Sequence, residues 1–291
     1  MNSLYLNWRF FFFSVLAGFL IISCDKFDGD QTIPSYIKID SIHFTAGFGN
    51  GSSSAKITDA WIYVDDELIG AFQLPAEVPV LKKGKHDIRI KAGIKMNGIS
   101  GTRVDYPFYQ PYTGSVYLAE DSVSTISPSV TYYDGVVFSW MESFEAGGVS
   151  MEKTSRSDTI LDKTSDPQLV FEGNYSGIVH MKAHDTLFEC ATINTYSLPT
   201  LGGKCFLELN YKTNNRVTIG LFGESQGQVV QSAVIVLNPS ANWNKIYINL
   251  TPKLQEMYKD VIVFKVFFAA LNDNDGDTPL LLFDNIKLLH F

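Results

Sequence analysis

Three aspartates in the segment LNDNDGDTP have the spacing of calcium ligands. Asp273, Asp275 and Asp277 alternate with other residues, and hard cations bind several oxygens that are supplied in this way. The calcium-loop pattern then fails, because Gly276 comes one position too early and no glutamate stands twelfth. Asp, Asn and Gly are also the usual turn formers. We therefore predict a solvated hairpin loop between the last two strands, with Asp273 and Asp275 as candidate ligand-binding residues and structural calcium as the alternative.

No other group of residues completes a catalytic or metal site in the sequence. His180 and His184 would place two imidazoles on one face of a strand, beside Asp185, but a third metal ligand is not identifiable. Four glutamates could face a cleft, although no motif pairs them for glycosidase chemistry: Glu142, Glu145, Glu172 and Glu189. Nucleophile elbows, Walker loops and dinucleotide-binding loops are absent from the sequence. We therefore expect no enzyme activity, no catalytic residue, no cofactor and no metal beyond the calcium alternative.

The first 24 residues have the organisation of an export signal. Arg9 is the only ionised side chain before Cys24, and an apolar stretch over residues 10–22 follows it. This stretch is too short to span a bilayer comfortably as a permanent helix. Its end, the sequence IISC at 21–24, resembles the lipobox of bacterial lipoproteins. The resemblance implies that residues 1–23 are a signal peptide, that the thiol of Cys24 is diacylated and that the new amino group is acylated.

The lipid and the acidic residues that follow it predict where the protein resides. Each buried methylene contributes about 0.8 kcal/mol, so several acyl chains anchor the protein durably in a lipid bilayer. Asp25 directly after the cysteine resembles the inner-membrane retention signal of enterobacterial lipoproteins. Asp25, Asp28 and Asp30 together resemble the acidic export signals on surface lipoproteins of glycan-foraging Gram-negative bacteria. We expect an outer-membrane lipoprotein, on the periplasmic face or at the cell surface.

Composition predicts an all-β protein that does not bind nucleic acid. A chain of 291 residues with 45% hydrophobic and 19% charged residues can build two packed domains. The 21 Phe and 14 Tyr residues, with Thr, Ser and Asn at polar positions, favour strands and turns over helices. The formal net charge is −8 and the Lys and Arg residues form no stripe, whereas phosphate binding requires a basic patch.

The mature chain begins with a tether and a first domain. Residues 24–34 are polar without apolar periodicity, so we interpret them as a flexible tether. The first domain is predicted over residues 35–134. Its pattern WIYVDDELIGAFQLP…LKKGKHDIRIKAG resembles β-sandwich modules of the PEGA or immunoglobulin-like kind over residues 60–93. The run DYPFYQPYTG at 105–114 either forms an exposed aromatic platform for sugars or proteins, or packs its rings inward.

The second domain is predicted over residues 135–291, where the character of the sequence changes. The segments FEGNYSG and DNIKL resemble the early and terminal strands of the jelly-roll β-sandwich in carbohydrate-binding modules and galactose-binding-like domains. One short helix is expected, capped by Thr251 and with Pro252 in its first turn. The fold class is therefore all-β, with two β-sandwich domains, the second a jelly roll with one short helix. We expect the two domains to fold independently, unless the aromatic run packs across their interface.

This architecture favours a binding function. We predict a non-catalytic protein that binds glycan through the jelly-roll domain, because exposed aromatic rings stack on sugars. Tyr175 and Trp243 are the aromatic candidates for ligand binding, alongside Asp273 and Asp275. The alternative is an accessory structural subunit of an outer-membrane protein complex, which would dock edge strands or aromatic loops onto its partner.

Two cysteines remain once Cys24 is assigned to the lipid. In an oxidising compartment Cys190 and Cys205 could form a disulfide, which would close a loop of about 15 residues and contribute on the order of 3 kcal/mol. Buried free thiols are the alternative, because cysteine is among the most buried residue types. The sequence leaves both readings open.

Overall fold

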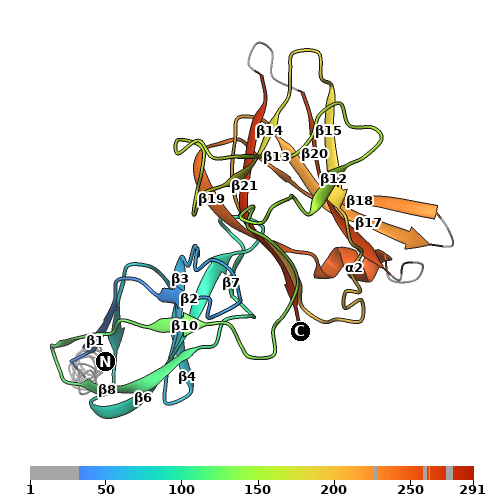
Figure 1. Ribbon diagram of the computed structural model, residues 1–291. Helices are drawn as coiled ribbons and strands as arrows, with labels where there is room; N and C mark the ends of the chain where they lie inside the picture. Colours follow the sequence, from blue (N-terminus) through green and yellow to red (C-terminus); the bar gives the residue numbers. More distant parts are fainter. Residues whose placement is uncertain (1–32, 226–227, 258–260, 262, 273–277) are drawn as a thin grey trace, which may run out of the picture.

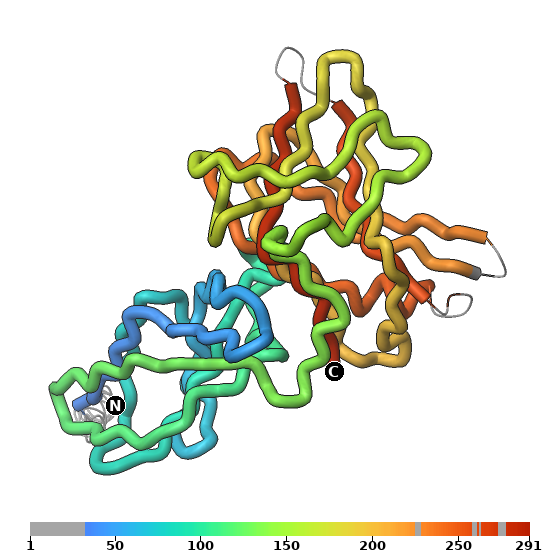
Figure 2. Tube along the Cα trace, viewed as in Figure 1, coloured from blue at the N-terminus to red at the C-terminus, as the bar shows by residue number. Residues whose placement is uncertain are grey.

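The computed structural model describes residues 33–225, 228–257, 261, 263–272 and 278–291. The described residues form an all-β structure of five sheets with one short helix, so the predicted fold class is confirmed. Two units are visible in Figure 1, a blue to green unit beside the N-terminal end and a larger unit that extends to the red C-terminal strand. Figure 2 follows the chain from the first unit into the second.

Three sheets build the first unit. A five-stranded antiparallel sheet has the order β4-β3-β6, and both β7 and β8 pair with β6. The other two sheets are β5-β1-β9 and β10-β2. The strands are β1 (Ser35–Ile39), β2 (His43–Thr45), β3 (Asp59–Val64), β4 (Glu67–Gln73), β5 (Ala76–Val80), β6 (Gly84–Lys95), β7 (Arg103–Asp105), β8 (Tyr112–Leu118), β9 (Val123–Thr125) and β10 (Ser129–Thr131).

The hairpin between β3 and β4 shows how turn residues set the register of this unit. Asp65 and Asp66 both have positive φ angles, of 53° and 62°, a conformation that Asp tolerates better than most residues. The turn pairs Val64 with Glu67 and directs Ile62 and Val64 into the core. The segment WIYVDDELIG therefore folds as a hairpin of β3 and β4.

Two antiparallel sheets form the second unit. One has the order β13-β14-β21-β16-β19, with β11 also paired to β21, and the other has the order β12-β15-β20-β17-β18. The elements are β11 (Val137–Glu142), β12 (Met151–Lys153), β13 (Asp162–Thr164), β14 (Ser176–His180), β15 (Leu187–Thr192), β16 (Cys205–Thr213), β17 (Val217–Ser225), β18 (Gln228–Leu237), β19 (Ser240–Asn249), α2 (Thr251–Met257), β20 (Phe264–Leu271) and β21 (Leu280–His290).

Alternating apolar residues close this sandwich around one core. Leu207 and Leu209 of β16 and Val266 and Phe268 of β20 are fully buried and belong to the same hydrophobic cluster. Side chains at alternate positions of a strand lie on the same face of its sheet, so the intervening residues face outward. The outward residues of β16 and β20 are the ones that build the two sites described below.

Helix α2 packs two side chains against this core. Leu254 and Met257 are its buried residues, which confirms the predicted short helix. The hydroxyl of Thr251 does not cap it as predicted, because it accepts a hydrogen bond from the backbone N–H of Cys205 at 3.0 Å. The backbone N–H of Thr251 donates instead to the side-chain oxygen of Asn249 at 3.1 Å.

The predicted hairpin between the last two strands is wrong. β20 pairs with β15 and β17, whereas β21 pairs with β11, β14 and β16 in the other sheet. β20 and β21 therefore belong to different sheets, each of which can bury the long apolar run of its strand. Asp273 and Asp275 lie outside the described residues.

The two units meet at an aromatic seam. Tyr106, Phe108 and Tyr109 of the first unit are 3%, 0% and 4% exposed, so the exposed platform is excluded and the rings pack inward. Their hydrophobic cluster includes Phe206 and Tyr247 of the second unit. Among the described residues, one isolated β-bridge pairs the backbones of the two units, between Met96 and Tyr247. Side chains therefore hold the seam together.

Candidate functional site

A cleft of about 520 Å³ opens on the outer face of the sheet β12-β15-β20-β17-β18. Its lining comes from the segments 152–156, 189–191, 222–224, 229–231 and 263–265. These segments are far apart in the sequence and meet because the pairing of β15 with β20, of β20 with β17 and of β17 with β18 brings them side by side. A hollow of about 600 Å³ lies elsewhere in the second unit, where Lys212, Asn214 and Ser240 are among its lining residues.

Aromatic rings make the apolar floor of the cleft. Phe222 of β17 lines it and packs on Phe267 of β20, with ring centroids 4.7 Å apart. Phe267 is 1% exposed although it faces away from the sandwich core. Gly220 makes room for it, because a Cβ there would approach the ring of Phe267 to 2.5 Å. The floor thus exposes part of one ring over a second, buried ring.

A buried carboxylate organises the polar wall. Glu189 of β15 is 2% exposed and faces the cleft. Its Oε1 accepts from Thr154 Oγ1 at 2.7 Å and from Arg156 Nε at 3.2 Å, and its Oε2 accepts from Arg156 Nη2 and from Gln231 Nε2 at 2.8 Å. Arg156 Nη2 also donates to Gln231 Oε1 at 2.7 Å. This network fixes the guanidinium of Arg156 at the edge of the cleft.

The remaining charged residues of the cleft lie nearer its rim. Lys265 of β20 forms an ion pair with Glu152 of β12 at 3.4 Å, and the side chain of Glu152 is 60% exposed. Glu224 is exposed as well. Glu189, the one buried carboxylate in the described lining, therefore has all of its acceptor positions occupied by protein donors. Its role is to hold Arg156 in place.

The aromatic candidates from the sequence lie elsewhere. Tyr175 is exposed in the loop before β14, with the ammonium of Lys163 4.2 Å from its ring centroid, and it lines a separate hollow of about 490 Å³. Trp243 of β19 packs on Phe171, with centroids 5.2 Å apart. Neither lines the cleft. Cys24, Asp273 and Asp275 lie outside the described residues.

The four glutamates from the sequence have separate roles. Glu189 lines the cleft, as described. Glu142 is buried and accepts from the backbone N–H groups of Phe144 and Ser150, both at 2.7 Å. Glu145 accepts from the N–H groups of the loop at 174–175, and these hydrogen bonds lower the pKa of its carboxyl. Glu172 accepts from Asn285 Nδ2 at 2.8 Å and from Ser52 of the first unit.

The expected pair of imidazoles on one strand is wrong. His180 is the last residue of β14, and His184 lies in the following turn, where its Nε2 is 3.5 Å from Asp185 Oδ1. The apolar pattern ends at Met181, so the strand cannot continue to His184. Within the described ranges no group of three His, Cys, Asp or Glu residues is placed to hold a metal ion.

Both described cysteines are free and buried. Cys190 lies in β15 and Cys205 in β16, which belong to opposite sheets of the sandwich, and the structure contains no bond between them. Burial raises the pKa of the Cys190 thiol and raises that of Cys205 to about 12. Of the two readings that the sequence left open, the structure adopts the buried thiols.

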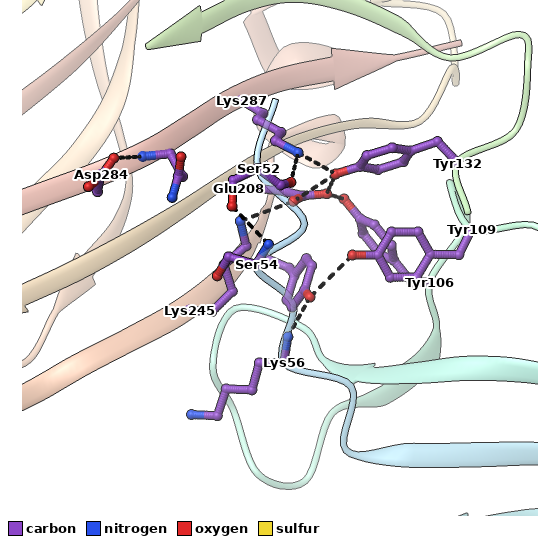
Figure 3. A network of polar contacts seen from close by, with 12 residues as sticks. Ser52, Ser54, Lys56, Tyr106, Tyr109, Tyr132, Glu208, Lys245, Asp284 and Lys287 are labelled. Atoms are coloured by element: carbon purple, nitrogen blue, oxygen red, sulfur yellow. Dashed lines mark hydrogen bonds and ion pairs between the residues drawn. The ribbon is translucent and has the colours of Figure 1, made fainter. Parts of the chain in front are cut away.

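A second polar network lies in the seam between the units (Figure 3). Glu208 of β16 is 0% exposed and accepts from Tyr106 Oη at 2.6 Å and from Tyr132 Oη at 3.0 Å. Lys245 Nζ lies 3.2 Å from Glu208 Oε2. Lys287 Nζ donates to the carbonyl of Ser52 at 2.7 Å. Two ammonium groups and one carboxylate are thereby buried under the first unit.

This seam network was not identified from the sequence. Glu208 and Lys287 were visible only as polar positions within strand patterns, which normally face water. The signal that could have found them is the aromatic run at 105–114, which supplies hydroxyl groups in a segment without other reason to be buried.

No protein-family model and no curated protein matches this chain. Solved structures that resemble it include TmCBM61 in complex with beta-1,4-galactotriose, which is 14% identical, covers 51% of this chain and 94% of its own, and has a TM-score of 0.33. A carbohydrate-binding module from the β-sandwich superfamily is 11% identical, with 82% and 86% coverage and a TM-score of 0.37. An exo-beta-agarase is 11% identical, with 53% and 24% coverage and a TM-score of 0.34. Likeness at this level carries no argument about the ligand of this chain.

No helix within the described residues is long and apolar enough to cross a membrane.

Proposed function

We propose that the protein is a membrane-anchored extracytoplasmic lipoprotein that binds glycan, without catalysing a reaction, in the cleft of its second unit. The observation that carries the proposal is the pairing of a partly exposed ring, Phe222, with a preorganised polar wall, Arg156 and Gln231, in one cleft. Sugars present a flat apolar face and a rim of hydroxyl groups, and sites for them combine aromatic packing with a few fixed polar groups.

A purely binding role is consistent with the carboxylates of the cleft. Glycosidases use two carboxyl groups about 5 to 10 Å apart, one of which must be free to exchange a proton or attack the sugar. Glu189 is held by four hydrogen bonds from Thr154, Arg156 and Gln231. A carboxylate in this state positions its neighbours and has no acceptor position left for a substrate proton.

A glycan array tests the binding function. We expect the mature chain, produced without its first 23 residues, to bind at least one glycan class and to release no new reducing ends from it on long incubation. If the mature chain bound no glycan on the array, the binding function would be contradicted. Release of new reducing ends would contradict the non-catalytic role.

The anchor is tested separately through Cys24. We expect the wild-type protein to take up labelled fatty acid in a bacterial host and to partition with the outer membrane, as acylation predicts. The Cys24→Ala variant should carry no label, and a Cys190→Ala variant serves as the matched control that keeps it. Unchanged labelling of Cys24→Ala would contradict the lipoprotein assignment.

One observation favours a second function, that of an accessory subunit of an outer-membrane protein complex. β18 is an edge strand of ten residues without a charge, proline or glycine, and the hairpin of β17 and β18 projects beyond the rest of its sheet (Figure 1). Val229 is 70% exposed and Val236 is 51% exposed on this strand. Uncharged edges of this length can accept a partner strand. Crosslinking from Val229 in whole membranes would reveal such a partner, and glycan binding alone would leave this strand without crosslinks.

A further inference from the structure

In the polar wall of the cleft, the hydrogen-bond acceptors are occupied by protein donors, whereas some hydrogen-bond donors are free. Both oxygens of Glu189 are saturated by two hydrogen bonds each. The amide oxygen of Gln231 accepts from Arg156, while its nitrogen uses one N–H toward Glu189 and has a second available. A ligand that reaches this wall therefore finds hydrogen-bond donors.

Arg156 is the main free donor. A guanidinium has five N–H groups in a rigid fork. Nε and Nη2 of Arg156 are turned toward Glu189 and Gln231, and among the described residues no partner is placed on Nη1. The Arg156 side chain is 57% exposed although Glu189 holds one of its edges. The two N–H groups of Nη1 are therefore the donors of Arg156 that remain for a ligand.

Further cations surround this donor edge. Lys265 rises from the floor strand β20, and its contact with Glu152 is long, at 3.4 Å between partly exposed side chains, so a ligand can replace it at small cost. Lys153 also lines the cleft. Glu189 is already neutralised by Arg156, and Glu224 at the rim is the one lining carboxylate without a cationic partner in the described structure.

The geometry points to a glycan that carries anionic oxygens, the carboxylate of a uronic acid or a sulfate ester, as the ligand class of this cleft. This inference rests on the proposed glycan-binding function and makes it specific. Each N–H of Nη1 can donate a charge-assisted hydrogen bond to such a group, which is shorter and stronger than a hydrogen bond to a neutral hydroxyl. The sugar face would pack on Phe222 while its anionic group meets Arg156, with Lys265 nearby.

Isothermal titration of the mature chain tests the inference with three sets of oligosaccharides of equal length. The sets are oligogalacturonates, sulfated galacto-oligosaccharides and neutral galacto-oligosaccharides. We expect one of the anionic sets to bind at least about tenfold more tightly than the neutral set, because charge-assisted hydrogen bonds are stronger than neutral ones. The stronger anionic set identifies the source of the charge, and its affinity should fall as salt is raised.

Variants assign the selectivity to Arg156. Arg156→Lys keeps the charge and removes the Nη1 donors, so the affinity for the preferred anionic set should fall by about tenfold. The matched control is Arg103→Lys in the first unit, because Arg103 contacts a buried Asp59 and the amide oxygen of Gln73 in the same way, far from the cleft. It should bind like the wild type. Circular dichroism and melting curves establish that both variants are folded.

The outcomes separate this inference from the function on which it rests. Equal or tighter binding of the neutral set overturns the anionic ligand class while glycan binding stands. Unchanged anionic affinity in Arg156→Lys also overturns it. Binding of none of the three sets, and of nothing on the glycan array, overturns both the inference and the proposed function. The wild-type comparison of anionic and neutral sets decides the matter even where Arg156→Lys fails to fold.

Discussion

Tyr106 of the first unit donates its phenolic hydrogen to Glu208 of the second, with 2.6 Å between Oη and Oε1. Both side chains are buried, and Tyr132 contacts both oxygens of the same carboxylate (Figure 3). Burial, followed by the nearby carboxylate, raises the pKa of Tyr106 well above its ordinary value, so the phenol remains a donor throughout the neutral range. A carboxylate in the second unit is therefore satisfied by groups that only the first unit supplies.

The first prediction concerns this hydrogen bond. Tyr106→Phe removes the hydroxyl and leaves the ring, so Glu208 loses one of its donors in a buried setting. We expect the free energy of unfolding to fall by about 1–3 kcal/mol, measured by urea denaturation. Tyr117→Phe, at a tyrosine that is 70% exposed, is the control and should change stability by less than about 0.5 kcal/mol. An equal effect of the two substitutions would contradict the role of the seam.

The second prediction concerns the folding unit. A fragment of residues 135–291 would expose Glu208, Lys245 and Lys287 together with Phe206 and Tyr247, all of which the first unit covers. We therefore expect this fragment to aggregate or to melt without a cooperative transition, although the sequence alone favoured independent folding. Calorimetry of the fragment and of the mature chain measures this. A sharp transition of the fragment at the temperature of the intact protein would restore independent domains.

The third prediction concerns pH and Lys287. Burial is the largest cause that lowers the pKa of this ammonium, from 10.5 to about 8. Between pH 8 and about 10 the unfolded state binds more protons at this group than the folded state, so stability should rise with pH, by up to about 1.4 kcal/mol per pH unit. In Lys287→Met the free energy of unfolding, measured by urea denaturation, should no longer rise with pH. A wild-type stability that falls over this range, or an equal slope in both proteins, would disagree with a buried ammonium.

The fourth prediction has the opposite sign and concerns Asp284. Burial is the largest cause that raises the pKa of its carboxyl, from 3.8 to about 6, although Ser176 Oγ and the N–H of Asn285 both donate to it. The folded state binds more protons between these values, so this group costs stability as pH rises from about 4 to 6. Asp284→Asn should therefore gain stability relative to the wild type across this window, with the difference constant above pH 7.

The fifth prediction concerns the thiols. Cys190 and Cys205 are fully buried with raised pKa values, so neither is available as a thiolate at neutral pH. Mass spectrometry without reduction should find two thiols that are alkylated in urea and resist alkylation in buffer. A loss of two hydrogens and no alkylation in urea would establish a disulfide instead.

Local patterns in the sequence predicted elements well. Asp65-Asp66 is a two-residue turn signal and the isoleucines of β6 alternate with other residues, and both patterns depend on a few neighbouring residues. The short helix over 251–257 was predicted from the same kind of signal, although the expected cap by Thr251 is wrong. Periodicity and turn chemistry are local, so they can be read without knowing what packs where.

Long-range partners were outside the reach of the same reasoning. The strands β20 and β21 are neighbours in sequence and lie in different sheets, which two apolar runs joined by turn residues cannot reveal. The cleft joins Arg156, Glu189 and Gln231 from three separate segments, and the sequence singled out Glu189 alone among them. The ring in its floor is Phe222, which is partly exposed, whereas the candidates from the sequence, Tyr175 and Trp243, lie outside the cleft.

The location of the glycan site is the central claim, and titration of two aromatic variants tests it most directly. The oligosaccharide that binds the mature chain most tightly is titrated into Phe222→Ala, in the cleft floor, and into Trp243→Ala, on the other sheet. Removing a ring that packs on the sugar should weaken the binding free energy by about 0.5–1.5 kcal/mol or more. We predict that Phe222→Ala loses affinity about tenfold while Trp243→Ala binds like the wild type. Retained binding by Phe222→Ala together with lost binding by Trp243→Ala would contradict the cleft as the glycan site.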